Sequence, residues 1–277
     1  MGEIEQLFRQ FDHGDGEWQQ FIKSIKITNI HGWTGQEMQF KFPVVAVVGE
    51  NGIGKSTFLK AAVCAYDNQA GKSFYPSKMF MSTQWDEPAL SGASIEYTVR
   101  LGNSSRNLKW KKTRDWGFAP KGKKPKRNTY FLDISRTLPL DATAGYAKIA
   151  MTANTEAGNS YALNEDNLRA LSFVLGQEYI NARFTGTDIN TTREVGLLTK
   201  NYGEISQFHQ GAGEDTMLDL FKLLQEIPTQ SLLVIDEVEN SLHPQAQRRL
   251  VRYLLKLART KKLQIILSTH SPFVLEE

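Results

Sequence analysis

The stretch Val44-Val45-Ala46-Val47-Val48-Gly49-Glu50-Asn51-Gly52-Ile53-Gly54-Lys55-Ser56-Thr57 decides the fold of this chain. It contains G-x-x-x-x-G-K-[ST], the phosphate-binding P-loop pattern. A β-branched run precedes the glycines, as a buried strand would, and a helical run over 58–63 follows them. A strand that turns through glycines into a helix directs backbone N–H groups and the positive end of the helix dipole at a phosphate. The stretch therefore predicts a nucleotide-binding site.

Each part of this stretch has an expected task. Lys55 is expected to reach the β- and γ-phosphates, and the Ser56 hydroxyl to hold Mg²⁺. The residues expected to bind the nucleotide are Gly49, Glu50, Asn51, Gly52, Ile53, Gly54, Lys55, Ser56 and Thr57.

Composition sets the general class of the protein. The chain has 277 residues, of which 40% are hydrophobic and 23% charged, as in ordinary globular proteins. No apolar run approaches the ~20 residues of a membrane span, and the polar, acidic N-terminus is no secretory signal. The single cysteine, Cys64, forms no internal disulfide. We therefore expect cytoplasmic residence and no membrane partner. The net charge of +3 does not by itself indicate a nucleic-acid partner.

A second apolar run, Ser231-Leu232-Leu233-Val234-Ile235, ends in the two acids Asp236 and Glu237. A P-loop ATPase needs a carboxylate for Mg²⁺ at the tip of the strand beside the P-loop, and Asp236 fits this task. A second carboxylate there can polarise the attacking water, and Glu237 fits that. Alone, the pattern is typical of any strand that ends at solvent. Downstream of a P-loop, it predicts the other half of an ATP site.

A third apolar run, Gln264-Ile265-Ile266-Leu267, leads into Ser268-Thr269-His270. The end of such a strand lies at the carboxyl edge of the sheet, where ligands bind in open α/β folds. A neutral imidazole there could contact the γ-phosphate or the attacking water. We therefore expect Glu237, His270 and Lys55 to be the catalytic residues.

The periodicity of the chain predicts an α/β fold with a mostly parallel sheet flanked by helices. Helices are expected over 4–11, 165–177 (capped by Asn164), 213–226 and 244–261, and strands over 21–30, 37–42, 94–101, 107–113, 128–134, 231–235 and 263–267.

The order of these three motifs resembles the ABC-type ATPase domain. The run Asp236-Glu237-Val238-Glu239-Asn240-Ser241-Leu242-His243-Pro244 is similar to the D-E-P-E-N-x-L-H-P run of the RecF/SMC/OLD-nuclease branch, with Val238 in place of proline. The resemblance spans residues 22–273 and implies a P-loop NTPase with an antiparallel β subdomain and a helical insertion. It also implies that residues 240–243 form the D-loop, which crosses to a second subunit.

On this resemblance we expect one domain over 1–277. Its expected parts are the N-terminal strands and P-loop in 18–64, the antiparallel β subdomain in 94–134, a mainly helical insertion in 141–205, and a lobe with the signature, the Asp236 strand and His270 in 206–277.

The family has two further elements. The Q-loop glutamine, which links Mg²⁺ to the rest of the domain, matches Gln84, although Gln69 is an alternative. The signature turn matches Gln210-Gly211-Ala212-Gly213-Glu214, with Gly211 where a serine is usual. Small residues at a helix N-terminus can approach the γ-phosphate of an ATP held by the partner subunit. Gly211, Ala212 and Gly213 are therefore expected to bind ATP in trans, although the turn could instead only cap the helix.

A basic arm over 106–127 interrupts the antiparallel region. It carries ten Lys and Arg against one acid, with Trp110, Trp116 and Phe118 between them. Such an arm suits phosphate contacts and base stacking, although charge runs are more often solvated loops. The residues expected to contact DNA or RNA are Lys121, Lys123, Lys124, Lys126 and Arg127.

Together these features predict an ATPase that dimerises around ATP and Mg²⁺ and acts in nucleic-acid metabolism, DNA repair or anti-phage defence by controlling an effector such as a nuclease or toxin. Two alternatives stay open: the nucleotide-binding subunit of a membrane transporter, and a non-catalytic, ATP-switched scaffold. Comparable domains continue beyond the strand that carries the histidine, so we expect either a fragment of a longer protein or one part of a split system.

Overall fold

A computed structural model describes residues 2–83, 90–133, 160–186 and 194–276 of the protein. Its helices are α1 (Glu3–Gly14), η1 (Asp15–Glu17), α2 (Lys55–Val63), α3 (Pro76–Met79), α5 (Glu165–Leu175), η6 (Gln207–His209), α6 (Ala212–Glu226), α7 (Pro244–Lys261) and α8 (Pro272–Leu275). Its strands are β1 (Gln20–Ile30), β2 (Trp33–Gln39), β3 (Val44–Val48), β4 (Asp67–Asn68), β5 (Ser94–Leu101), β6 (Ser104–Lys112), β7 (Trp116–Ala119), β8 (Lys126–Arg127), β9 (Thr129–Leu132), β10 (Ser160–Ala162), β11 (Asn181–Gly186), β12 (Glu194–Lys200), β13 (Gly203–Ser206), β14 (Leu232–Ile235) and β15 (Gln264–Thr269).

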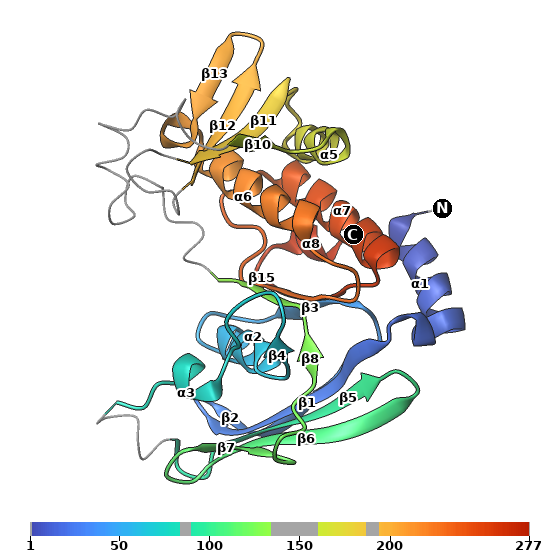
Figure 1. The fold of residues 1–277 in the computed structure, drawn as a ribbon, viewed down its shortest axis with the longest axis vertical. Coiled ribbons are helices and arrows are strands. Elements are labelled where there is room, and N and C mark those ends of the chain that lie inside the picture. Colours follow the sequence, from blue (N-terminus) through green and yellow to red (C-terminus); the bar gives the residue numbers. More distant parts are fainter. Residues whose placement is uncertain (1, 84–89, 134–159, 187–193, 277) are drawn as a thin grey trace.

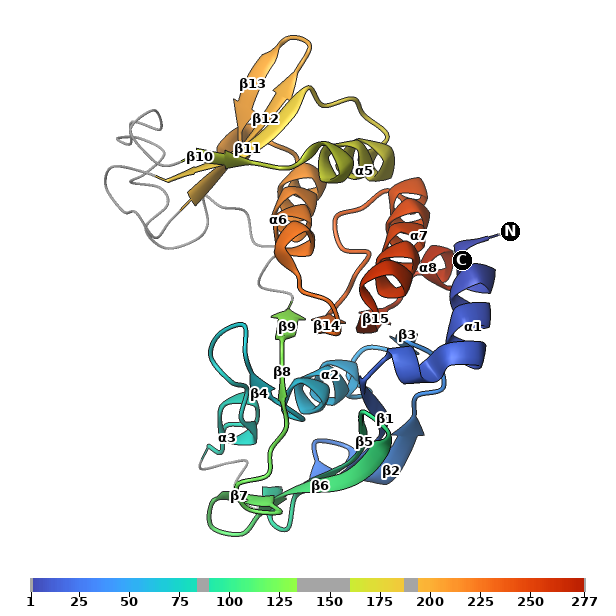
Figure 2. The same ribbon diagram turned by 45° about the vertical axis from the view of Figure 1, so that its right-hand side comes forward.

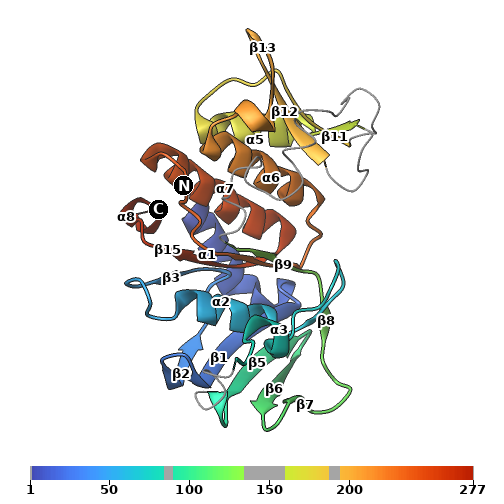
Figure 3. The ribbon, with the colours of Figure 1, turned by 90° about the vertical axis from the view of Figure 1, so that its left-hand side faces the viewer.

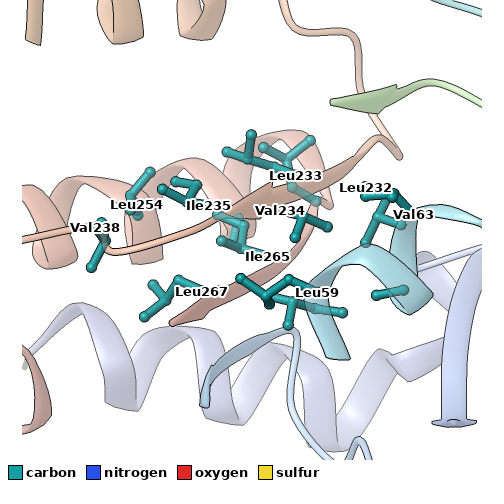
Figure 4. Close-up of a cluster of buried hydrophobic side chains, with 14 of the residues drawn as sticks. Leu59, Val63, Leu232, Leu233, Val234, Ile235, Val238, Leu254, Ile265 and Leu267 are labelled. Carbon is teal, nitrogen blue, oxygen red and sulfur yellow. The ribbon is translucent and has the colours of Figure 1, made fainter. Parts of the chain in front are cut away.

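A parallel sheet with the strand order β3-β15-β14-β9 lies in the middle of the molecule (Figure 1). Its strands are short apolar runs, and every residue of β14 is buried, as expected for a sheet covered on both faces. Leu233 and Ile235 point toward α7, whereas Val234 points toward Leu59 and Val63 of α2 (Figure 4). Burying one such side chain contributes roughly 1.5–3 kcal/mol to folding. Because the strands are parallel, their carboxyl ends meet at one edge.

The antiparallel sheet β2-β1-β5-β6-β7 lies on the α2 side of the parallel sheet (Figures 1 and 2). One buried polar side chain, Gln264, joins the sheets, and the buried Arg127 supports it. The amide of Gln264 on β15 exchanges two hydrogen bonds with the backbone of Ile22 on β1, at 2.8 and 2.9 Å. The Arg127 guanidinium donates to Gln264 Oε1 at 3.1 Å and to the Ser231 carbonyl at 3.2 Å. The two sheets are therefore tied together by satisfied polar contacts inside the core.

Helices α6, α7 and α8 lie on the other face, and α5 and a small antiparallel sheet with the order β10-β11-β12-β13 lie beyond them (Figure 3). The prediction of a mainly helical insertion over 141–205 is wrong for the described residues, which hold one helix and these four strands. The strands are short, and β12 carries four buried residues in succession rather than an alternating pattern. These segments form strands because they pair with one another, and the local periodicity of the sequence does not reveal that pairing.

Most other predicted elements are confirmed. The helix expected over 244–261 has those bounds, and the strand expected over 94–101 does as well. Asn164 caps α5, accepting a hydrogen bond from the Asn167 N–H at 2.9 Å. The strand expected over 37–42 instead spans Trp33–Gln39, because Trp33 pairs with Ile30 across the turn from β1. Among the described helices, none is both long and apolar enough to span a bilayer.

Candidate active site at the carboxyl edge of the parallel sheet

The predicted P-loop joins β3 to α2. Gly52 and Gly54 have φ values of 82° and 99°, in the left-handed region that favours glycine. A Cβ on Gly54 would also lie 2.5 Å from Nε1 of Trp33. The indole N–H of Trp33 donates to the Gly54 carbonyl at 3.2 Å, and its ring stacks on Phe58 of α2. The β2 aromatic thus holds the loop in position, a role that the sequence did not reveal.

Lys55 is the first residue of α2 and is folded back over the loop. Its ammonium donates to the carbonyls of Gly49 and Glu50, each at 2.8 Å. Because these partners belong to the loop itself, the ammonium already lies where a phosphate held by the loop would need a cation. The structure therefore places the Lys55 ammonium over the predicted P-loop.

The next two hydroxyls differ in their surroundings. Ser56 is exposed at the N-terminus of α2. Thr57 is buried, and its Oγ1 lies 3.0 Å from Nδ1 of His31. Ser56 is thus available to a metal ion, whereas the Thr57 hydroxyl is occupied. Thr57 can therefore contact a nucleotide only through its backbone N–H.

Asp236 follows β14 directly and is only 5% exposed. The Ser268 hydroxyl donates to Asp236 Oδ1 at 2.5 Å and accepts from the Glu237 N–H at 2.8 Å. Glu237 itself has a φ of 49°, which turns the chain sharply away from the strand. One buried hydroxyl on β15 therefore fixes both acids of the predicted pair. Ser268 was missed as a site residue, because its role depends on the pairing of β14 with β15.

The order of strands corrects one expectation. The Asp236 strand was predicted to lie beside the P-loop strand, but β15 lies between β3 and β14. His270 follows β15 and is exposed. His270 therefore lies at the same edge of the sheet, between the P-loop and the two acids Asp236 and Glu237. The three predicted motifs converge because all three strands are parallel.

Ser56 and Asp236 fit the chemistry of a Mg²⁺ site. Both present oxygen ligands, and Mg²⁺ on nucleotides is usually held by one or two protein oxygens together with phosphates and water. Within the described part of the chain, no group of three or more His, Cys, Asp or Glu side chains could hold a metal by itself. Gln84, the expected third contributor, lies outside the described residues.

The expected signature turn begins α6. Gly211 precedes the helix with a φ of −67°, and the backbone N–H of Gly211 lies 3.4 Å from Glu214 Oε2. A Cβ on Gly213 would lie 2.6 Å from the Ser241 carbonyl oxygen. The turn therefore packs against the expected D-loop, and Gly213 permits the close approach.

Glu214 anchors this turn to neighbouring elements. Its Oε1 accepts from Lys200 and from the Tyr179 hydroxyl, each at 2.6 Å. Burial would raise the pKa of Glu214, but the hydrogen bonds from Lys200 and Tyr179 outweigh it and hold the pKa below its ordinary value. The carboxylate is therefore ionised and paired near neutral pH.

The basic arm is only partly available to a nucleic acid. Lys121, Lys123 and Lys126 are exposed. Lys124 instead pairs with Asp67 at 3.2 Å, and burial lowers its pKa despite this partner. Arg127 is 2% exposed and forms part of the core network. The prediction that Lys124 and Arg127 contact nucleic acid is therefore wrong, because protein acceptors and aromatic rings already engage both.

The fold and this edge together are those of a P-loop nucleotide-binding domain. A family model described as "AAA domain, putative AbiEii toxin, Type IV TA system" matches residues 44–276. The chain belongs to this family of AAA-type ATPases. No curated protein matches the sequence.

Solved structures agree on the fold. An SMC head bound to the C-winged helix domain of ScpA is 14% identical, with a TM-score of 0.58 over 92% of this chain and 91% of that one. An Smc head with an extended coiled coil, bound to the C-terminal domain of ScpA derived from Pyrococcus furiosus, is 10% identical, with a TM-score of 0.56 over 93% and 91%. The SMC head from Thermotoga maritima is 17% identical, with a TM-score of 0.51 over 92% and 91%. The predicted resemblance to the RecF/SMC branch is thereby confirmed at the level of the fold.

Proposed function

We propose that this protein binds Mg²⁺–ATP at its P-loop, dimerises around the bound nucleotide and hydrolyses it. The observation that carries the proposal is the shared edge of the parallel sheet, where the P-loop, Asp236, Glu237 and His270 meet. Phosphoryl transfer requires positioning and charge stabilisation more than covalent chemistry by the protein, and this edge offers both.

The roles follow from the geometry. Lys55 exchanges its two loop carbonyls for phosphate oxygens. Ser56 and Asp236 would hold Mg²⁺, which would neutralise charge on the phosphates. Glu237 accepts a proton from the attacking water, and His270 orients that water or contacts the γ-phosphate. Ser268 keeps Asp236 and Glu237 in place.

Dimerisation is supported by the pairing of the signature turn with the D-loop. Gly213 lies against Ser241, which supports a shared surface of the two segments toward a second copy. In that arrangement Gly211, Ala212 and Gly213 contact the γ-phosphate of ATP held by the partner through backbone N–H groups. Gly211 supplies no hydroxyl, which favours slow turnover and also keeps an ATP-switched scaffold as a second candidate function.

For the biological role, we propose control of an effector in nucleic-acid metabolism or anti-phage defence. The family description names a toxin system, and two of the similar SMC heads are bound to parts of ScpA. Both support a partner-controlled ATPase. Lys121, Lys123 and Lys126 supply a basic surface for DNA or RNA.

The test compares the wild-type protein with Glu237→Gln. The glutamine cannot take a proton, so this variant should bind ATP, hydrolyse it at least about a hundredfold more slowly and accumulate as a dimer in gel filtration. Turnover at the wild-type rate would remove Glu237 from catalysis. A wild-type protein that hydrolyses no ATP, with or without DNA, would favour the scaffold.

A further inference from the structure

The segments that leave β14 and β15 stay connected beyond the end of the sheet. The parallel ladder pairs Ile235 with Leu267 as its last residues. After it, the N–H of Val238 donates to the Ser268 carbonyl at 3.2 Å. Further still, the N–H of His270 donates to Glu239 Oε1 at 2.5 Å. At this last step a side-chain carboxylate replaces the backbone carbonyl of a regular ladder.

The two oxygens of Glu239 have different surroundings. Oε1 accepts from His270, whereas Oε2 is covered by protein and has no hydrogen-bond partner among the described residues. A covered carboxylate oxygen without a partner lowers stability. Folding alone therefore does not explain a carboxylate here. The hydrogen bond to His270 does explain why residue 239 carries a carboxylate.

The position of Glu239 couples two parts of the site. It lies three residues after Asp236, on a segment fixed by Ser268, and it holds the backbone of His270 from across the gap. The His270 side chain is exposed, so packing restrains it weakly, and its backbone determines where the imidazole can reach.

We propose that Glu239 is a positioning residue for His270, which holds the imidazole in register with Asp236 and Glu237. Glu239 acts through the His270 backbone and does not touch the nucleotide. This inference rests on the proposed ATPase function, in which His270 contacts the γ-phosphate or the attacking water.

The hydrogen bond is tested first without nucleotide, by amide hydrogen exchange of His270 in the ¹⁵N-labelled protein. Glu239→Ala removes the acceptor, so exchange of this amide should accelerate at least about tenfold. Glu239→Gln keeps an acceptor oxygen, so its exchange should stay within about threefold of wild type. Glu5→Ala, at an exposed glutamate of α1, is the matched control. Unchanged exchange in Glu239→Ala would overturn the inference.

ATP hydrolysis then tests whether the Glu239–His270 hydrogen bond supports catalysis. Glu239→Ala should lower kcat about tenfold with KM within about twofold, and Glu239→Gln should restore most of the loss. In a His270→Ala background, Glu239→Ala should cause no further loss, because Glu239 acts only through His270. Losses that multiply in the double variant would show a general structural role and overturn the inference.

The outcomes separate this inference from the proposed function. If the wild-type protein hydrolyses ATP but the two losses multiply, only the role of Glu239 falls. If the wild-type protein does not hydrolyse ATP, the proposed function falls and the catalytic purpose of Glu239 falls with it. The exchange experiment decides the anchoring bond in either case.

Discussion

Ser268→Ala tests whether one hydroxyl organises the acidic half of the site. The Ser268 side chain is fully buried, donates to Asp236 at 2.5 Å and accepts from the Glu237 N–H at 2.8 Å. Alanine removes both bonds and adds no bulk. A hydrogen bond to a charged group contributes about 1.5–3 kcal/mol and a neutral one about 1 kcal/mol. The free energy of unfolding should therefore fall by about 2.5–4 kcal/mol.

The effect on hydrolysis follows from the loosened acids. If the freed movement of Asp236 and Glu237 costs about 1.4–2.7 kcal/mol of transition-state stabilisation, kcat falls about 10- to 100-fold. Steady-state ATP hydrolysis at saturating Mg²⁺–ATP measures this change, and denaturant unfolding measures stability. Temperatures well below the unfolding midpoint of the variant keep the two effects separate.

A matched control lies at the other end of the same strand pair. Ser231 is also fully buried, and its hydroxyl donates to the Pro228 carbonyl at 2.7 Å. Ser231→Ala should cost about 1 kcal/mol of stability and leave hydrolysis unchanged. The reasoning is refuted if Ser268→Ala hydrolyses ATP at the wild-type rate, or if Ser231→Ala loses as much activity.

Three further predictions concern binding. Lys55→Ala removes the only ammonium seen over the loop in the described residues, so ATP affinity should fall about a hundredfold or more; wild-type affinity in calorimetry would contradict its assignment. Gly213→Ala places a methyl group 2.6 Å from the Ser241 carbonyl, so it should cost about 1–3 kcal/mol of stability and weaken ATP-dependent dimerisation, and an unchanged dimer in gel filtration would argue against the turn. Replacing the three exposed lysines of the arm, Lys121, Lys123 and Lys126, with glutamate should abolish salt-sensitive DNA binding. An anisotropy titration measures this, and unaltered binding would contradict the prediction.

Local patterns in the sequence were sufficient for the elements that carry the chemistry. The P-loop needs glycines at fixed spacing between a strand and a helix, and the hydrophobic pattern of the sequence predicts both of these flanking elements. The same holds for β14, whose apolar run ends at Asp236. Because parallel strands end at one edge, the convergence of Lys55, Asp236 and His270 followed from the fold class.

What the sequence did not reveal depends on partners far along the chain. Arg127 looked like part of a solvated basic run, but it is buried because Gln230, Ser231 and Gln264 supply acceptors more than a hundred residues away. The role of Ser268 can be recognised only from the pairing of β15 with β14. Such contacts are fixed by tertiary structure, and no local pattern encodes them.

The central claim is that separate segments of the chain converge on one magnesium-bound triphosphate. Its most direct test is a crystal structure of the protein with Mg²⁺ and a non-hydrolysable ATP analogue. We expect the triphosphate in the 49–57 loop, the ion held by Ser56 and Asp236, and the 211–213 turn of a second copy against the γ-phosphate. An empty loop, or an ion remote from Asp236, would contradict the account.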